Sequence, residues 1–348
     1  MAKFRVALSG DFQKPDGSPA YPMFDLSPLM SDPRIEMGYV PPVDGVMPAA
    51  ALADYDALIL LAPKFNAASI APGGRLAVVA RFGVGYDSVD VPACTQGDIA
   101  LCITPDGVRR PVAVSILTLI FALTGKLMIK DRLTRQGPDG FNKRAQHMGE
   151  GLAGKVLGSI GIGNIGAELF RLARPFDFKF IAHDPFADKN LARELGIELV
   201  SLEDVFRRSD ILCVNCPLTP ETRHIVNAGR LAIMKSTAYL INTSRGSTVD
   251  QQALTTALRE RRIAGAGLDV FEIEPPAADD PILALDNVIV TPHALCWTDQ
   301  CFAGNGAADV KAVLDVMAGR EPAAIVNRTV TGREGWRRKL EANRKAFA

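Results

Sequence analysis

The stretch that most constrains this chain is residues 155–166, an apolar run that leads into three closely spaced glycines. Gly161, Gly163 and Gly166 are followed by the helix-forming run 167–170. Gly-x-Gly-x-x-Gly between a strand and a helix is the fingerprint of a dinucleotide-binding turn. The first glycine permits a tight turn, the second lets the backbone approach a pyrophosphate, and the third allows close packing of helix and strand. We therefore expect the N-terminus of the helix to bind phosphate here.

An acidic residue stands where the same fingerprint requires one. The run 178–183 predicts the next strand, and it ends at Asp184. In this fingerprint an acidic residue ~20 positions after the glycines binds the ribose of NAD. The spacing from Gly166 to Asp184 is close to that value. Because a carboxylate would repel a 2′-phosphate, Asp184 predicts NAD and not NADP. The alternative for these residues is an ordinary βαβ turn with a helix-capping aspartate.

Composition narrows the class of protein. The 348 residues allow two domains of ordinary size, and 48% of them are hydrophobic. Lysine plus arginine and aspartate plus glutamate both number 39, so the formal net charge is zero and neither a nucleic acid nor a membrane surface is an expected partner. The apolar patch 112–123 falls short of the ~20 residues that span a bilayer. The first residues lack the features of a signal peptide, so we expect a cytoplasmic protein with six reduced cysteines.

Two of these cysteines form a C-x-x-C pattern. Cys213 and Cys216 lie in a strand-like run, whereas a redox C-x-x-C opens a helix. We expect buried thiols and no metal site.

The order of elements indicates an α/β fold with parallel sheets, because short strands alternate with helices along most of the chain. In the first part the expected strands are 4–9, 56–61 and 76–80; in the second they are 156–161, 178–183, 197–200, 210–214, 237–242, 264–268 and 287–291. The second set is a complete doubly wound nucleotide-binding domain. A long apolar helix is expected to start at Pro111 and run to about residue 132, and another is expected over 299–318.

We predict two Rossmann-like domains, with the nucleotide-binding domain inserted into a discontinuous substrate domain. The boundaries are 1–105 for the first part of the substrate domain, 106–297 for the NAD-binding domain and 298–330 for the return to the substrate domain. The basic tail 331–348 is expected to form a solvated terminal helix.

Three residues that could carry chemistry follow successive late strands. Arg245, Glu274 and His293 lie at or beyond the carboxyl ends of the runs 239–242, 264–268 and 287–291. Ligands of open α/β sheets bind beyond those strand ends. A guanidinium, a carboxylate and an imidazole are therefore expected to converge beside the nucleotide. Taken singly, each residue could instead be a surface ion pair, a loop acid or a core histidine.

These motifs together resemble the D-isomer-specific 2-hydroxyacid dehydrogenases. The resemblance runs from about residue 55 to 327 and rests on Gly83-Val84-Gly85-Tyr86-Asp87, the fingerprint, Pro217-Leu218-Thr219-Pro220-Glu221-Thr222, Asn242-Thr243-Ser244-Arg245-Gly246, Gly267-Leu268-Asp269-Val270-Phe271, Glu274-Pro275 and Pro292-His293-Ala294. It implies hydride transfer between NAD(H) and a small 2-hydroxy or 2-oxo acid, with catalytic Arg245, Glu274 and His293. It also implies a homodimer, formed partly through the long helix. Cofactor contacts are implied for Asn164, Ile165, Asp184, Cys216, Pro217, Thr222, Thr243, Ser244 and Asp269, and substrate contacts for Val84 and Gly85.

Some positions depart from the family pattern. Asp106, Val114, Ser244 and Trp297 differ from the residues usual in the family, which bears on the pocket, the hinge and the dimer contact. Lys64 and Trp297 are expected to border the pocket, and Lys64 would favour a substrate with a further polar or anionic group.

Other functions remain open. An NAD(H)-sensing, non-enzymatic corepressor of the same fold would keep the three catalytic residues. Formate dehydrogenase is disfavoured by Glu274, and a phosphoglycerate dehydrogenase with a regulatory domain by the short tail after residue 330.

Overall fold

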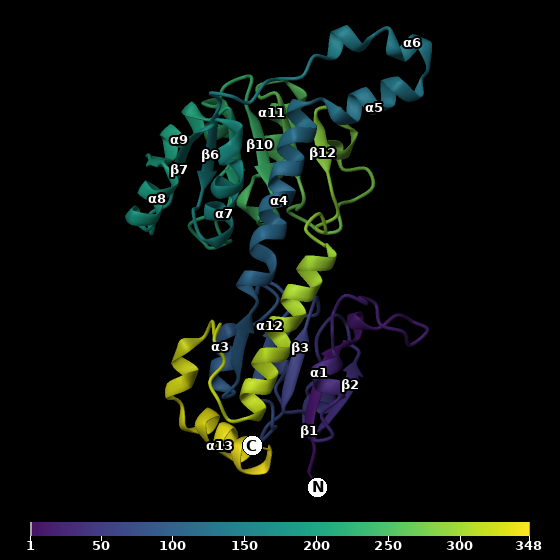
Figure 1. Cartoon of the computed structure of the whole chain (residues 1–348), viewed down its shortest axis with the longest axis vertical. Coiled ribbons are helices and arrows are strands. Elements are labelled where there is room, and N and C mark those ends of the chain that lie inside the picture. Colours follow the sequence, from purple (N-terminus) through teal and green to yellow (C-terminus); the bar gives the residue numbers. More distant parts are fainter. Residues whose placement is uncertain (1, 348) are drawn as a thin grey trace. The chain divides into compact units, whose positions relative to one another are not determined.

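Within residues 2–347, which the computed structural model describes, twelve strands form two sheets whose strands all run parallel. Figure 1 shows the elements along the chain. The strands are β1 (Phe4–Ser9), β2 (Ile35–Val40), β3 (Ala57–Leu60), β4 (Val78–Arg81), β5 (Ala100–Ile103), β6 (Val156–Ile160), β7 (Lys179–His183), β8 (Ile197–Leu199), β9 (Ile211–Val214), β10 (Tyr239–Asn242), β11 (Gly265–Leu268) and β12 (Val288–Val290).

The helices connect these strands and cover the sheets. They are α1 (Ser27–Met30), α2 (Ala49–Leu52), α3 (Val91–Gln96), α4 (Pro105–Thr124), α5 (Leu127–Arg135), α6 (Pro138–Phe141), α7 (Asn164–Ala173), α8 (Lys189–Leu195), α9 (Leu202–Arg208), α10 (Ala228–Ala232), α11 (Gln251–Arg259), α12 (Asp299–Met317) and α13 (Glu334–Phe347), with seven short 3₁₀ turns between them.

The chain divides into two compact units. Unit 1 comprises residues 1–108 and 298–348, and unit 2 comprises residues 109–297. Unit 1 holds a five-stranded sheet in the order β2-β1-β3-β4-β5. Its two faces are both buried, because successive residues of β3 alternate between two apolar clusters: Ala57 and Ile59 belong to one, Leu58 and Leu60 to the other. Burial on both faces is typical of a parallel sheet.

Unit 2 holds a seven-stranded sheet in the order β12-β11-β10-β9-β6-β7-β8. After β6 the chain adds β7 and β8 on one side, and it then returns to add β9 to β12 on the other. The direction of winding therefore reverses between β6 and β9. This switch point is where open α/β sheets bind ligands, and the glycine fingerprint follows β6 directly.

These sheets confirm the predicted fold class, although two strands were missed. The mixed run of β2 contains Gly38 and three other half-exposed residues, so no clear period marks it. The strand β5, a run of four apolar residues, was also missed. Both lie at the edges of the unit 1 sheet, and their pairing with β1 and β4 is a tertiary feature.

The long apolar helix begins earlier than predicted. Helix α4 starts at Pro105, contains Pro111 within it and ends at Thr124, and α5 follows as a separate helix. Pro111 is the seventh residue of α4 and lies beyond the first turn, so its missing N–H removes one hydrogen bond of the helix. The break comes at Lys126, which has a left-handed backbone. The expected single helix from Pro111 to about residue 132 is therefore wrong.

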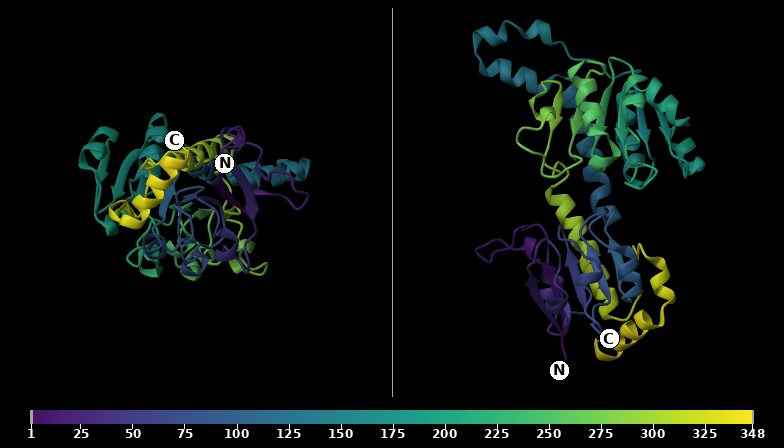
Figure 2. Two further views of the ribbon diagram at one scale, coloured as in Figure 1. Left: turned by 90° about the horizontal axis from the view of Figure 1, so that it is seen from below. Right: turned by 180° about the vertical axis from the view of Figure 1, so that it is seen from behind.

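By length and composition alone, the 20-residue helix α4 could cross a membrane, which corrects the expectation that its apolar patch is too short. In the structure 56% of its apolar window is buried inside the protein. Ala113, Ile116 and Ile120 are fully buried in the core of unit 2. After α4, the arm formed by residues 127–147 reaches away from the sheet of unit 2 (Figure 2), and every residue of α5 is at least partly exposed.

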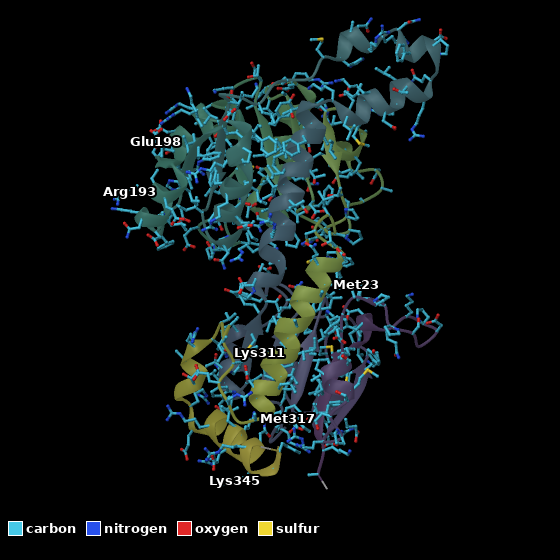
Figure 3. All side chains as sticks on the ribbon, viewed as in Figure 1. Met23, Arg193, Glu198, Lys311, Met317 and Lys345 are labelled. Atoms are coloured by element: carbon cyan, nitrogen blue, oxygen red, sulfur yellow. The ribbon has the colours of Figure 1, made fainter. Side chains whose placement is uncertain are left out.

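Helix α12 packs one face on the sheet of unit 1. Met317 is buried in that core, whereas Lys311 on another face is exposed and pairs with Asp315 at 2.6 Å (Figure 3). Near its start, Gly304 approaches Gly107 so closely that a Cβ at Gly304 would lie 3.0 Å from the Gly107 Cα.

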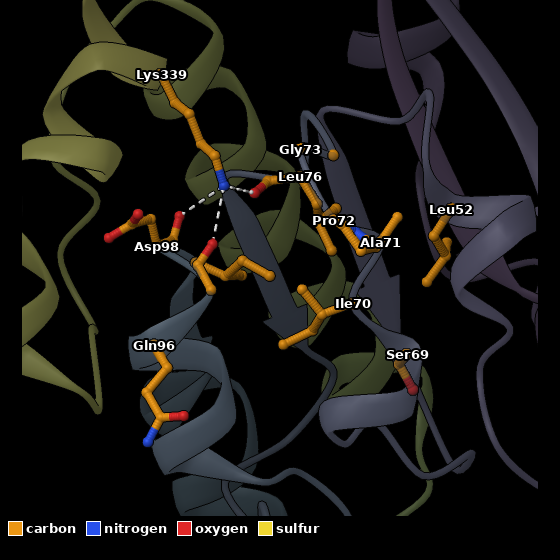
Figure 4. Close-up of a pocket in the computed structure, with 13 residues that line it drawn as sticks. Leu52, Ser69, Ile70, Ala71, Pro72, Gly73, Leu76, Gln96, Asp98 and Lys339 are labelled. Atoms are coloured by element: carbon orange, nitrogen blue, oxygen red, sulfur yellow. Dashed lines mark hydrogen bonds between the residues drawn. The ribbon is translucent and has the colours of Figure 1, made fainter.

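The basic tail forms a helix, α13, as expected. The expectation that this helix is solvated is wrong, because one of its faces is buried. Trp336 is buried in the core of unit 1, and its indole N–H donates to the Ala77 carbonyl at 2.9 Å. The Lys339 ammonium donates to the carbonyl oxygens of Leu76, Gly97 and Asp98 beside a cavity of about 280 Å³ (Figure 4). The tail is thus amphipathic and closes the amino-terminal edge of this sheet.

Candidate active site

The nucleotide turn connects β6 to α7. Gly161 has a φ of +95°, in the region that side chains rarely adopt, which allows the sharp turn. A Cβ at Gly166 would lie 2.5 Å from the Gly161 carbonyl oxygen, so only glycine lets the helix start this close to the strand. Asn164 and Ile165 occupy the first turn of α7, and the N-cap residue Gly163 has no side chain with which to cap the helix. The first backbone N–H groups of α7 are therefore oriented to bind a phosphate.

Asp184 follows β7 and faces this turn. One carboxylate oxygen accepts the backbone N–H of Ile162 at 2.9 Å, and the other accepts that of Phe186 at 2.9 Å. Each oxygen has a second lone pair. The carboxylate is therefore held against the glycine turn and can still accept hydrogen bonds from a ribose.

Arg245 lies in the loop after β10. The buried side chain of Asn242 organises this loop, because its oxygen accepts the Ser244 N–H at 3.0 Å and its amide donates to the Arg245 carbonyl at 3.0 Å. A Cβ at Gly246 would collide with the Phe271 carbonyl, so the loop presses against the segment after β11. Arg245 is thereby placed beyond the carboxyl end of the sheet.

Glu274 and His293 are in direct contact. The His293 Nδ1 lies 2.8 Å from the Glu274 Oε2, and the Phe271 N–H donates to Oε1 at 2.9 Å. Burial alone would raise the pKa of Glu274, but its hydrogen bonds with His293 and Phe271 lower the pKa below its ordinary value. The positive charge of Arg245 contributes in the same direction.

The geometry also sets the tautomer of the imidazole. An ionised carboxylate only accepts hydrogen bonds, so the Nδ1 of His293 must donate its proton to Glu274. The Nε2 is then the atom that can take up or release a proton. His293 has a φ of +55°, and residues held in this left-handed region are concentrated at functional sites.

Asp269 holds the loop that carries His293. Its buried carboxylate accepts the Thr291 hydroxyl at 2.6 Å and the backbone N–H groups of Ala294 and Leu295 at 3.2 Å. Asp269 was predicted as a cofactor contact from its motif. In the structure its carboxylate contacts this loop, and so it holds the chain on both sides of His293.

The other predicted cofactor residues lie in loops at the same edge of the unit 2 sheet. Thr222 donates its hydroxyl to the Pro217 carbonyl at 2.6 Å and so closes the loop after β9. Thr243 and Ser244 are half-buried beside Arg245. Cys216 is buried, and burial raises the pKa of its thiol to about 11, while Cys213 is buried within β9. The expectation of buried thiols for this pair is confirmed.

The predicted substrate contacts divide between the units. Val84, Gly85 and Lys64 belong to unit 1, whereas Trp297 is the last residue of unit 2 and is 48% exposed. Lys64 is exposed, but its backbone N–H donates to Gly45 and its carbonyl accepts from Met47. Within each unit these residues follow strand ends, as expected.

A second imidazole–carboxylate pair was missed. The His224 Nε2 lies 2.6 Å from the Glu272 Oε1, next to the loops just described. Glu272 stands two residues before Glu274, and His224 stands two after Thr222. Their closeness to two recognised motifs is the sequence feature from which this pair could have been predicted.

A fingerprint turn at a switch point, with an imidazole–carboxylate pair at the same sheet edge, defines a dinucleotide-binding α/β protein with acid–base groups. Residues 117–294 match the family model "D-isomer specific 2-hydroxyacid dehydrogenase, NAD binding domain". A glyoxylate reductase from Korarchaeum cryptofilum is 37% identical over 282 residues, which cover 80% of this chain and 84% of that protein.

Two further relatives agree. A D-3-phosphoglycerate dehydrogenase from Methanocaldococcus jannaschii is 37% identical over 254 residues, which cover 73% of this chain and 48% of that protein. The crystal structure of a D-lactate dehydrogenase from Aquifex aeolicus, complexed with NAD and lactic acid, matches with a TM-score of 0.78 and 27% identity, over 92% of this chain and 99% of that chain. The chain therefore belongs to the D-isomer-specific 2-hydroxyacid dehydrogenase family of NAD-dependent oxidoreductases.

Proposed function

We propose that this protein interconverts a D-2-hydroxy acid and its 2-oxo acid with NAD(H), using His293 as acid/base, Glu274 as the partner of His293, and Arg245 to bind the substrate carboxylate and carbonyl. The contact between Nδ1 of His293 and Oε2 of Glu274 is the observation that carries this proposal. The chemistry supplied by NAD(H), when bound, is hydride transfer to or from the carbonyl carbon.

The residues of the site divide the remaining work. Arg245 presents fixed donors that fit a carboxylate and polarise the adjacent carbonyl. In the reductive direction the Nε2 of His293 gives a proton to the new alkoxide oxygen, and in the oxidative direction it takes that proton back. Glu274 orients the ring and stabilises its protonated form, which is the role of the third group in such sets.

We further propose that residues 106–297 bind NAD and that residues 1–105 and 298–330 contribute the substrate contacts. Val84 and Gly85 would bind the substrate carboxylate through their backbone. Lys64 would favour a substrate with a second anionic group, because its backbone is anchored on both sides while its side chain is exposed.

The direct test is NADH oxidation by the purified protein. The panel contains glyoxylate, hydroxypyruvate, pyruvate and bulkier 2-oxo acids, each size class with and without a second anionic group. Turnover of a member supports the proposal, and the order of kcat/KM values identifies the substrate class. NADH binding without turnover of any member would instead support the NAD(H)-sensing corepressor.

Cofactor choice gives a prediction of its own. We expect the protein to use NADH about 100-fold more efficiently than NADPH, because Asp184 accepts from the ribose and repels a 2′-phosphate. Asp184→Asn should reduce this ratio of kcat/KM values about tenfold or more, since the negative charge is lost. The matched control Glu194→Gln removes an exposed acid of the neighbouring helix α8 and should leave the ratio unchanged. Equal efficiency of the wild type with the two cofactors would contradict the assignment.

We also propose a homodimer formed through α4 and the arm. Six large apolar side chains in α4, in the arm and at the residue just after the arm are between 38% and 77% exposed: Val114, Phe121, Leu127, Met128, Phe141 and Met148. Light scattering should give twice the chain mass of 37.3 kDa. Met128→Glu should shift the mass toward that of one chain, whereas Met30→Glu, at the still more exposed Met30 of unit 1, should not. A wild type with the mass of one chain would exclude the dimer.

A further inference from the structure

The second imidazole–carboxylate pair shares a short segment with the first. Glu272 and Glu274 stand two residues apart in the irregular chain after β11, and each carboxylate contacts one imidazole. The Glu272 Oε1 lies 2.6 Å from the His224 Nε2, and the Glu274 Oε2 lies 2.8 Å from the His293 Nδ1. Both histidines have a left-handed backbone, with φ values of +50° and +55°.

Glu274 depends on this segment for its position. Its Oε1 accepts the N–H of Phe271, three residues earlier, so the carboxylate is anchored to the segment itself. The segment is anchored in turn at Glu272, whose N–H donates to the Gln251 side-chain oxygen at 2.9 Å. A displacement of Glu272 would therefore be transmitted to Glu274.

His224 is held firmly enough to serve as an anchor. Its backbone N–H donates to the Ser247 carbonyl at 2.9 Å, and the Val226 N–H donates to the Thr248 carbonyl at 3.0 Å. These bonds join the loop after β9 to the loop that follows Arg245. The contact between His224 and Glu272 then joins the loop after β9 to the segment after β11.

The Glu272 carboxylate has three neighbouring donors, and the imidazole of His224 is the nearest of them. Arg223 lies 3.3 Å from the same carboxylate oxygen, but its side chain is 56% exposed. The Gln251 N–H approaches the other oxygen at 3.5 Å, and its amide donates to Asp280 at 2.7 Å. The imidazole contact, at 2.6 Å, is shorter than the contacts of the Glu272 carboxylate with Arg223 and with the Gln251 N–H.

We propose that His224 is a positioning residue for the Glu274–His293 pair and acts on it through Glu272. This inference rests on the proposed catalytic roles of Glu274 and His293. Catalytic groups need neighbours that lock their geometry, and small displacements of such groups lower rates strongly. Without the His224 contact, Glu274 samples more positions and interacts less with the protonated ring of His293.

Two variants of His224 separate its side-chain contact from its backbone. Asparagine tolerates the left-handed backbone but is too short to replace Nε2, whereas the longer glutamine places an amide near the position of Nε2. In His224→Asn we expect kcat for 2-oxo acid reduction to fall severalfold. The pH at which kcat/KM declines should move in the same direction as in Glu274→Gln, but by less. His224→Gln should restore both quantities.

The double variant His224→Asn/Glu274→Gln tests the route of the effect. If His224 acts through Glu274, the decline should occur at the same pH as in Glu274→Gln alone. The proposal would be overturned if the double variant declined at a lower pH than Glu274→Gln alone, by as much as His224→Asn shifts the wild type. So would a lower melting temperature of His224→Asn with an unmoved decline, because His224 would then only stabilise the fold.

The readout distinguishes this inference from the proposed function. The pH of the decline does not depend on how much enzyme is folded, so partial unfolding cannot imitate the shift. If Glu274→Gln itself leaves the decline unmoved, the proposed role of Glu274 fails, and the inference fails with it. If Glu274→Gln moves the decline and His224→Asn does not, only the inference about His224 fails.

Discussion

Replacement of His293 with asparagine is expected to lower kcat by about 10²- to 10⁴-fold in both directions, the usual contribution of a general acid–base group. Asparagine tolerates the left-handed backbone at this position. Its amide can replace the Nδ1 contact with Glu274, but it offers no counterpart of Nε2. The variant therefore removes the proton donor while it preserves the fold of the loop. Steady-state rates of NADH oxidation and of NAD reduction measure the effect.

Two comparisons make the His293 result specific. The affinity for NADH, measured by fluorescence titration, should stay unchanged, because the glycine turn and Asp184 are untouched. His147→Asn changes another histidine, in the short 3₁₀ turn before β6, and should leave kcat at the wild-type value. A His293→Asn protein with a kcat within a few-fold of the wild type would contradict the assignment.

Replacement of Glu274 with glutamine should move the pH dependence of both reactions. A neighbouring carboxylate favours the protonated form of an imidazole. Reduction requires protonated His293, so without the charge of Glu274 its rate should decline at lower pH. Oxidation requires neutral His293, so its rise with pH should also begin at lower pH. Profiles of kcat/KM in the two directions test this, provided that chemistry limits the rate.

The maximal rate of Glu274→Gln should also fall. Both partners of the carboxylate, the Nδ1–H of His293 and the N–H of Phe271, are donors. A glutamine offers one acceptor oxygen and one NH₂ group, so it can satisfy only one of them. Asp279→Asn, which removes an exposed acid from the same loop, should leave the profiles in place. Profiles of Glu274→Gln that coincide with the wild type, or move to higher pH, would rule out Glu274 as the electrostatic partner of His293.

The sequence alone was sufficient for features that depend on neighbours along the chain. The turn at Gly161, Gly163 and Gly166 needs its glycines because of local backbone geometry and one strand–helix contact. The strands of unit 2 were predicted from continuous apolar runs, which a doubly covered parallel sheet requires. The predicted fold class, family and NAD dependence are confirmed, and each rests on such runs and motifs.

Only the tertiary structure decided which residues meet across the sheet edges. The strand β2 has no apolar period of its own and exists because β1 offers it hydrogen bonds. Helix α13 looked solvated because its charges dominate the sequence, yet Trp336 finds a partner in Ala77, far away along the chain. His224 and Glu272 meet because parallel strands bring their carboxyl ends to one edge. A turn or a buried strand is stabilised by residues close together in the sequence, so a local pattern predicts it. Contacts between residues far apart in the sequence form only after distant segments have packed together.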